Sequence, residues 1–433
     1  MRIHRYPEEK ELLNQKLSRR KKLYDRSLVQ SVTDIFNQVA ESGDEAILHL
    51  TEKFDHVQLD TLRISEEYIR KCVGQIPDEL LRAIHHARRN IEEVNRYLLP
   101  EDMKTVKIRE GTVIGEKTTP LASVGLWVPA RKGPLISTAL MLVGAAKVAG
   151  VKRIVVGMAP NARGEADPAT VAASNLAGAT DIVVGNGVGV IAGFSMGTET
   201  IPEVDGIFGP GPGGIAAAMS VAFSYGKKTV LGIGPTDSAI ICDETADPEI
   251  LAYDMINEGE HGPDSSSILA TTSMEVAEGV CRHLDEYLKK GPERGSILQT
   301  VFSEEGLGAV IHCESLEDAM DVINEYAPEH MIIKCKKNNE EAVLSGIRNA
   351  GEILVGEYAP FTAGNYAIGI TAVLPTNGYA KSVSGITSKD MVKTSTIGIL
   401  DREALHRLLP TIREIGKWEG LPSHVLAVEK RFE

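Results

Sequence analysis

The segment EYAPEHM, residues 325–331, contains two side chains that could exchange protons with a substrate. Pro328 precedes Glu329 and His330, and the apolar run MIIKC follows, so the pair lies between a predicted helix and a predicted strand. Imidazole titrates near neutrality, and a carboxylate can accept a proton from a bound water. The pair is a candidate general base and water activator, although most Glu-His pairs are surface features.

Two further segments could bind a divalent cation. Glu258 and His261 in EGEHGPDSS are three residues apart at the end of a predicted helix, a spacing that places both on one helix face. A solvated helix end is the alternative interpretation. Near the C-terminus, EGLPSHVLAVEKR contains Glu419 and His424, which taken alone fit an ordinary helix start.

Two Gly-rich turns could approach a phosphate. GPGPGG, residues 209–214, fits the GxGxxG pattern, but Pro210 and Pro212 remove N–H donors that a phosphate loop needs, which favours a structural turn. GNGVGV, residues 185–190, follows the predicted strand DIVV but lacks the full spacing. Neither turn is specific for a nucleotide by itself.

Composition excludes several classes of function. The 433 residues are 43% hydrophobic and carry a net charge of −14, which indicates a globular protein and argues against nucleic acid and anionic membranes as partners. The N-terminal MRIHRYPEEKELL has no apolar core of a signal peptide, and no long apolar run occurs. The five cysteines are scattered and never form a CxxC pair, which argues against disulfides and a thiolate zinc site. We therefore expect a cytoplasmic protein.

The elements that must position these residues follow a regular order. The first hundred residues have apolar residues at helical spacing, and from VGLWVPA (124–130) short β-rich runs alternate with helical ones. A second alternating series runs from SAIICDE to EILVG, and helical patterns return after Ser388. The sequence predicts an α/β fold with two Rossmann-like domains, parallel sheets, and helical N- and C-terminal segments.

We predict the following boundaries from these patterns and from the resemblance described next. They are an N-terminal helical segment at 1–24, a first α/β domain at 25–120 and 237–380 with metal and catalytic residues, a cofactor-side α/β domain at 121–236, and a C-terminal helical tail at 381–433.

Taken together and in order, a set of segments resembles the histidinol dehydrogenase family over nearly the whole chain. The segments are VGLWVPARKGPLISTALM, GTETIPEVDGIFGPG, GPTDSAIICDETADPE, EHGPDSSSILAT, EYAPEH, GEYAPFTAGNYA with AVLPTNG, and EGLPSHVLAVEKR. The resemblance implies a zinc- and NAD-dependent homodimer that oxidises an amino alcohol through an aldehyde to an acid. By the same resemblance, His330 is the general base of the first oxidation and Glu329 activates water for the second.

The resemblance also implies a metal site. The ligand positions are Glu258, His261, Asn365 and His424, where the family has Gln, His, Asp and His. The exchange of Gln for Glu and of Asp for Asn leaves two imidazoles, one carboxylate and one amide oxygen, a set suited to zinc.

The cofactor and substrate positions depart further from the family. Trp127, Gly189 and Pro212 stand where the family has Tyr, Gln and Asn around NAD, so an aromatic platform is kept and two polar contacts are lost. Thr236 and Glu419 are the implied substrate-binding residues.

Two further substrate positions differ. Ala372 replaces a family His, and Arg131 and Lys132 add charge that could attract an acidic substrate.

We interpret the chain as an NAD-linked alcohol dehydrogenase acting on histidinol or on another small alcohol, an anionic one included. The alternative is a metal-binding protein on the same fold that has lost NAD-dependent catalysis. The retained Glu329-His330 pair argues against that alternative, because a binding protein has no evident need for it.

Overall fold

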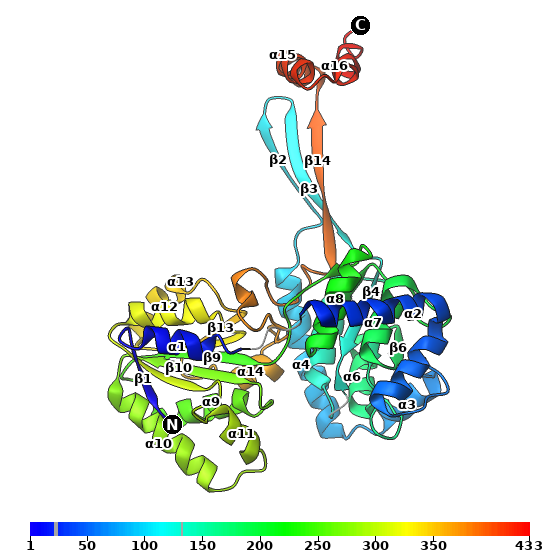
Figure 1. Ribbon diagram of the computed structural model, residues 1–433. Coiled ribbons are helices and arrows are strands. Elements are labelled where there is room, and N and C mark those ends of the chain that lie inside the picture. Colours follow the sequence, from blue (N-terminus) through cyan, green and yellow to red (C-terminus); the bar gives the residue numbers. More distant parts are fainter. Residues whose placement is uncertain (21–24, 131–132) are drawn as a thin grey trace. The chain divides into compact units, whose positions relative to one another are not determined.

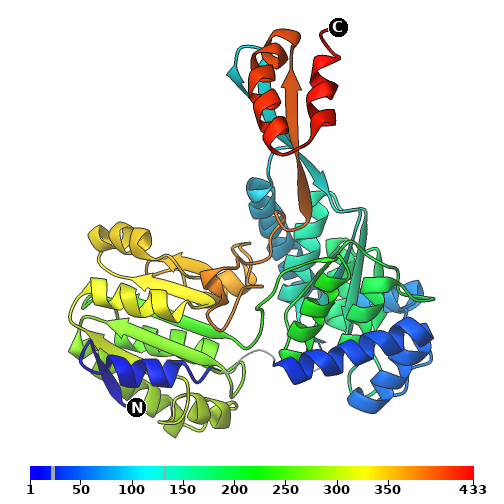
Figure 2. The same ribbon diagram turned by 45° about the horizontal axis from the view of Figure 1, so that its top comes forward.

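The computed structural model describes residues 1–20, 25–130 and 133–433. The chain divides into two compact units (Figures 1 and 2). The first unit is Met1–Leu98 with Leu121–Met391, and the second is Leu99–Pro120 with Val392–Glu433. The predicted α/β class with parallel sheets is confirmed in the first unit, which contains two such sheets.

A six-stranded sheet forms one half of the first unit. Its strands are β1 (Ile3–Tyr6), β9 (Asp237–Cys242), β10 (Ser266–Thr271), β11 (Ala309–Cys313), β12 (His330–Lys334) and β13 (Glu352–Val355). They lie in the order β1-β11-β10-β9-β12-β13, and every pair is parallel. Strands buried on both faces need continuous apolar runs, and SSILAT and HMIIK have every residue buried.

Helices cover both faces of this sheet (Figure 1). One face packs against α9 (Pro248–Gly259), α10 (Met274–Lys289) and α11 (Gly295–Val301), and the other against α1 (Lys10–Leu17), α12 (Leu316–Tyr326) and α13 (Lys337–Gly346). Successive residues of β9 face opposite layers: Ile240 belongs to the first core and Ile241 to the second. A short helix, α14 (Phe361–Tyr366), follows β13.

A five-stranded parallel sheet forms the other half. Its strands are β4 (Ser123–Val128), β5 (Arg153–Met158), β6 (Asp181–Val184), β7 (Gly206–Phe208) and β8 (Lys228–Thr229), in the order β6-β5-β4-β7-β8. Its helices are α2 (Arg26–Leu50), α3 (Glu66–Gly74), α4 (Asp78–Leu98), α5 (Ile136–Ala149), α6 (Pro168–Ala177), α7 (Gly187–Met196) and α8 (Gly213–Ser224). Two short turns, η1 (Thr51–Asp55) and η3 (Tyr379–Lys381), complete the first unit.

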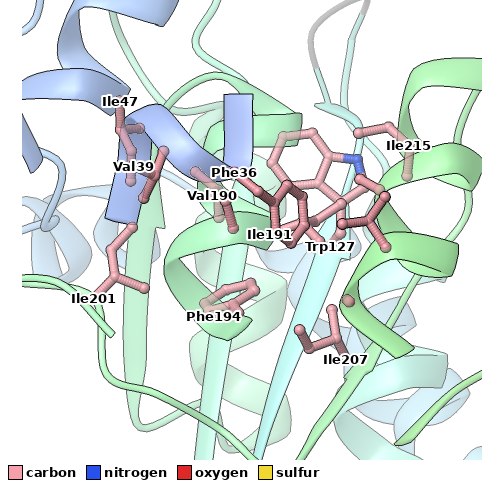
Figure 3. Packing of buried hydrophobic residues seen from close by; sticks show 14 of the residues in the cluster. Phe36, Val39, Ile47, Trp127, Val190, Ile191, Phe194, Ile201, Ile207 and Ile215 are labelled. Carbon is pink, nitrogen blue, oxygen red and sulfur yellow. The ribbon is translucent and has the colours of Figure 1, made fainter. Parts of the chain in front are cut away.

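The packing of α2 corrects the predicted domain boundaries. The prediction grouped 25–120 with 237–380, but Val32, Phe36 and Val39 of α2 share one core with residues of α7, α8 and β4 (Figure 3). Residues 26–98 therefore cover the five-stranded sheet. The physical reason is that α7 and α8 need a further apolar layer, and the apolar stripe of α2 supplies it.

Both ends of the chain contain a strand in addition to the predicted helices. The N-terminal segment begins with β1, whose Ile3 pairs with Val310 at the edge of the six-stranded sheet. The C-terminal tail begins with β14 (Val392–Leu400), and its polar, Thr-rich pattern gave no apolar alternation by which to recognise a strand.

The second unit is a three-stranded antiparallel sheet with two helices. The sheet contains β14, β3 (Thr112–Pro120) and β2 (Met103–Arg109) in that order, and the helices are α15 (Arg402–Trp418) and α16 (Pro422–Glu429). All seven residues of β2 are exposed. No helix within the described ranges of the whole chain is both long and apolar enough to cross a membrane.

Candidate active site

Charged side chains gather at the amino-terminal edge of the six-stranded sheet. Strand β12 begins at His330, and the parallel register places His330 beside Ser238 of β9 and beside Glu352 of β13. Glu329 directly precedes the strand. The turn from α12 passes through Ala327, whose φ of 51° lies in the left-handed region, and Pro328. This turn brings Glu329 and His330 to the sheet edge together.

His330 lies between two carboxylates. Its Nδ1 is 2.5 Å from Glu352 Oε1, its Nε2 is 3.5 Å from Glu329 Oε1, and all three side chains are buried. The ring of Phe361 packs edge-on against the imidazole at 5.9 Å between centroids. A hydrogen bond from Nδ1–H to Glu352 fixes the orientation of the ring and directs Nε2 toward Glu329.

The electrostatic environment changes the pKa of Glu329 and the pKa of His330. Burial raises the pKa of Glu329 to about 7, although the neighbouring imidazole opposes this shift. Burial alone would lower the pKa of His330, but the negative charges of Glu329 and Glu258, with the hydrogen bonds that the ring donates to Glu329 and Glu352, hold it well above the usual value. Glu329 is therefore close to half-protonated near neutral pH, which suits an acid–base catalyst.

Glu352 was missed in the sequence interpretation. EILVG was recognised only as a strand, and the signal that identifies Glu352 is its register opposite His330 on the neighbouring strand. Register between strands separated by a helix is not visible in a single sequence.

Glu258, His261 and Asn365 lie together next to this array. Glu258, in the last turn of α9, is fully buried, and its Oε1 accepts hydrogen bonds from Asn257 Nδ2 at 2.6 Å and Asn365 Nδ2 at 3.1 Å. Its Oε2 is 3.6 Å from His261 Nε2 and has no hydrogen-bond partner within the described residues. A buried carboxylate oxygen without a donor is costly unless a cation or water satisfies it.

This cluster fits a metal ion in part. It supplies one carboxylate, one imidazole and one amide, and within the described ranges no group of three or more His, Cys, Asp or Glu side chains is arranged to hold a metal. His424, the fourth predicted ligand, belongs to the second unit, where it is exposed in α16. Glu419, the predicted substrate-binding carboxylate, is likewise exposed in the second unit, directly after α15.

A cleft of about 530 Å³ connects these side chains. Its polar wall includes Thr236, His261, Glu329, His330 and Asn365. Its apolar wall includes side chains of α4, of α5 and the residue before it, and of the loop after α14; they are Leu80, Ala83, Ile84, Ala87, Leu135, Ile136, Leu140, Met141 and Ala372. Arg131 and Lys132, expected to attract an acidic group, lie outside the described residues.

The three positions predicted around a cofactor present few polar groups. Trp127, at the carboxyl end of β4, is only 2% exposed (Figure 3), and a side-chain carbon at Gly187 would come within 2.7 Å of its ring. The indole fills the space between the first turns of α7 and α8 in this structure, and the role of Trp127 as the aromatic platform for a cofactor stays a prediction. The indole Nε1 has no hydrogen-bond partner within the described part of the chain.

Gly189 and Pro212 have structural explanations. The N–H of Gly189 donates to Asn186 Oδ1 at 3.3 Å, and an added side-chain carbon would lie 3.3 Å from both Ile47 and Leu50. Pro212 is the N-cap of α8, and no described side chain caps that helix. Parallel α/β sheets bind nucleotides where the strand order reverses, which here is between β4 and β7. Trp127 and Pro212 lie at this switch point, but the three side-chain positions add no polar contacts for an anionic cofactor.

A buried acid–base array at the edge of a parallel sheet, open to a half-apolar cleft, defines an α/β enzyme that moves protons on a small molecule. The histidinol dehydrogenase family model matches residues 18–432. Histidinol dehydrogenases of Synechocystis sp. and Methanopyrus kandleri are each 36% identical, and the matches cover 97% and 100% of both chains. The crystal structure of histidinol dehydrogenase from Elizabethkingia anophelis matches with a TM-score of 0.92 and 30% identity, over 99% of this chain and 98% of that one. The chain belongs to the histidinol dehydrogenase family and is an oxidoreductase that acts on CH–OH groups.

Proposed function

We propose that the protein is a zinc-dependent, NAD-linked alcohol dehydrogenase that oxidises a small alcohol through the aldehyde to the acid. The observation that carries this proposal is the buried Glu352–His330–Glu329 array, with distances of 2.5 and 3.5 Å on the two sides of the imidazole. A two-step oxidation needs one group that deprotonates an alcohol and another that deprotonates water, and the array offers both.

His330 performs the first proton transfer. Glu352 holds the proton on Nδ1, and Nε2 accepts the proton of the substrate hydroxyl in the form of the ring that has lost its second proton. The raised pKa of His330 makes this form the minor one at neutral pH, and makes it a stronger base. Removal of the hydroxyl proton drives hydride loss from the carbinol carbon, and the product is the aldehyde. NAD, when bound, supplies the hydride acceptor.

Glu329 performs the second proton transfer. Its carboxylate accepts a proton from water as the water oxygen adds to the aldehyde carbon. The hydrate then loses its own hydride and becomes the acid. The pKa of Glu329, about 7, supports this role because a base with that pKa is both available and effective at neutral pH.

Zinc would be held by Glu258, His261 and Asn365. The unpartnered Oε2 of Glu258, 3.6 Å from His261 Nε2, supports this assignment. Turning the Asn365 amide would direct its oxygen, rather than its NH₂ group, toward the ion. His424 of a second copy of the chain is the proposed fourth ligand. Zinc supplies a Lewis acid that orients the polar groups of the substrate.

A homodimer with shared active sites is proposed because the second unit leaves many apolar side chains exposed. Its exposed apolar side chains include Val106 and Ile399, both 56% exposed, and Trp418, 85% exposed. A three-stranded sheet needs a packed apolar face for stability, and a second copy of the same chain would provide one. The same association would carry Glu419 and His424 to a partner's cleft.

The substrate is proposed to be a small alcohol, either histidinol or a related compound. Family membership supports histidinol, because the relatives are named histidinol dehydrogenase. The apolar wall of the cleft, with Ala372 in place of the family His, supports a different substituent on the alcohol. A cytoplasmic location is proposed from the five free cysteines.

The test uses the zinc-loaded protein with NAD and a panel of alcohols: L-histidinol, small neutral alcohols and small anionic alcohols. We expect one member to yield about two NADH per alcohol and the corresponding acid. The His330→Ala protein is the control for contaminating dehydrogenases. If no alcohol is oxidised and calorimetry detects no binding of NAD, the protein is instead a metal-binding protein on this fold.

A further inference from the structure

Asp237 contacts Glu329 at two places. Asp237 is the first residue of β9 and is 1% exposed. Its Oδ1 accepts a hydrogen bond from the backbone N–H of Glu329 at 2.6 Å, and its own N–H donates to Glu329 Oε2 at 3.2 Å. One oxygen of Glu329 is therefore held by the backbone of β9, and the other, Oε1, is directed at His330.

The second oxygen of the Asp237 carboxylate accepts two hydrogen bonds. Oδ2 accepts hydrogen bonds from the backbone N–H of Asn377 at 2.5 Å and from Arg20 Nη1 at 3.1 Å. These contacts join three segments that are distant in sequence: the chain after α1, the turn before β12, and the loop before η3. A buried carboxylate that accepts three hydrogen bonds is rigid, and so is the backbone that it holds.

Arg20 compensates the buried charge of Asp237. Its Nη2 donates to the carbonyl of Tyr326 at 2.5 Å, and its guanidinium lies 4.0 Å from the centre of the Tyr326 ring. Burial raises the pKa of Asp237, and the positive charge of Arg20 opposes that shift. The planar guanidinium can satisfy the carboxylate and the carbonyl at once, which a lysine could not do with the same geometry.

We propose that Asp237, held by Arg20, is a positioning residue that orients the Glu329 carboxylate for the hydration of the aldehyde. A free glutamate side chain samples many rotamers, whereas Glu329 is fixed through its N–H and through Oε2. Misplacement of a reacting group by about 1 Å can cost about 10²-fold in rate. The inference rests on the proposed role of Glu329 and concerns only the second oxidation.

The same strand provides a matched control. Asp243 directly follows β9 at its other end and is 2% exposed. Its carboxylate accepts hydrogen bonds from the N–H of Lys336 at 2.8 Å, the N–H of Thr245 at 3.1 Å and Asn339 Nδ2 at 3.3 Å. Asp243 thus joins β9 to the chain after β12, as Asp237 joins β9 to the chain before β12, but it does not contact Glu329.

The experiment compares Asp237→Asn with Asp243→Asn in the zinc-loaded enzyme with NAD. The probe is the alcohol that the panel identifies, supplied once as the alcohol and once as its aldehyde. We expect Asp237→Asn to lower kcat for the aldehyde by about 10–10²-fold with KM little changed, and to alter oxidation of the alcohol by less than about threefold. Asp243→Asn should lower the melting temperature to a similar extent and leave both rates within about twofold of the parent.

Arg20→Lys provides a second variant if Asp237→Asn does not fold. It keeps the compensating charge and loses the planar fork, so we expect a loss of about 3–10-fold confined to aldehyde oxidation. The positioning role would be overturned if Asp237→Asn and Arg20→Lys each slowed alcohol and aldehyde oxidation equally. It would also be overturned if the loss of rate in these variants and in Asp243→Asn simply followed the loss of stability.

Glu329→Gln distinguishes this inference from the proposed function. If Glu329→Gln stalls aldehyde oxidation and both Asp237→Asn and Arg20→Lys leave it unchanged, only the positioning role is wrong. If Glu329→Gln also leaves it unchanged, the proposed function of Glu329 is wrong and the positioning role with it.

Discussion

The two units of the chain differ in the kinds of side chain that they bury and expose. The first unit buries charged groups: Asp237, Glu258 and Glu329 are at most 5% exposed and make hydrogen bonds to named partners. The second unit exposes apolar groups, of which Trp418 is the most exposed at 85%. Buried charge is costly and is kept where chemistry requires it, whereas exposed apolar surface is kept where another surface covers it. The contrast distinguishes the buried acid–base array of the first unit from the exposed apolar surface of the second, which we propose a second copy of the chain covers.

The largest effect should come from the buried imidazole. His330→Ala removes the base of the first oxidation and should lower the rate of alcohol oxidation by about 10²–10⁴-fold. His312→Ala, on β11 of the same sheet, is the matched control and should retain most activity. The measurement is initial NADH formation at saturating alcohol. Comparable losses in the two variants would mean that the sheet, and not the imidazole, limits the rate.

Glu329→Gln should separate the two oxidations. We expect the alcohol step to remain nearly unchanged, while the aldehyde accumulates because its hydration falls by about 10²–10⁴-fold. Glu340→Gln changes another buried carboxylate, on α13, and should leave both steps intact. Trapping of the aldehyde with semicarbazide measures its release. An equal decrease in both steps would refute the division of roles between Glu329 and His330.

Zinc retention tests the charge of Glu258. Glu258→Gln would leave the ion with neutral ligands only and should weaken zinc binding by at least about tenfold. Glu258→Gln with Asn365→Asp should restore it, and Asn365→Asp alone should retain zinc but lower activity. Zinc content per chain after dialysis against a mild chelator compares the four proteins. If Glu258→Gln keeps as much zinc as the parent, a neighbour such as Glu260 is the ligand.

The pH dependence of aldehyde oxidation should follow Glu329. The pKa of Glu329 is raised to about 7, and only the deprotonated form can accept a proton from water. The rate should therefore rise about tenfold per pH unit below about 7 and level off above it. Single-turnover rates between pH 5 and 9 provide the measurement. A rate that is flat across pH 7 would assign the water activation to another group.

Mixing of inactive protomers tests what the exposed unit contributes. His330→Ala and His424→Ala proteins should each be inactive, and random reassortment should restore about a quarter of the parental activity, because half of the dimers carry one intact site. Two His330→Ala preparations, separately tagged, are the control for the mixing procedure. Absence of recovery at every ratio would mean that each active site is built from a single chain.

Local patterns in the sequence were enough to predict much of the fold and part of the candidate site. Short apolar runs that alternate with helical segments were enough to predict parallel sheets. The reason is that strands covered by helices on both faces must be apolar throughout. The i, i+3 spacing of Glu258 and His261 sufficed to place them on one face, and the structure has them 3.6 Å apart. Glu329 and His330 are adjacent in the sequence, so their proximity could be predicted without knowledge of the tertiary structure.

Contacts between distant segments could not be read in the same way. Glu352 reaches His330 only because β12 and β13 are neighbours in a given register, and Arg20 reaches Asp237 across most of the sequence. The side-chain direction of Trp127 depends on how tightly α7 and α8 approach, which is set by Gly187 and Ile215. The three-stranded sheet was missed because its strands lack the regular alternation of apolar and polar residues that predicts a strand.

The pairing of β1 with β11 has a consequence for biosynthesis. Ile3 lies opposite Val310, so β1 emerges from the ribosome long before its partner strand β11 has been translated. The five-stranded sheet uses only strands between Ser123 and Thr229 and can therefore assemble much earlier. Arg20 likewise waits for Asp237 and Tyr326 before its charge is neutralised. The edge of the six-stranded sheet that carries Glu329 and His330 is consequently the last part of the first unit to form. Until then, nascent chains carry an unpaired strand and an uncompensated cation.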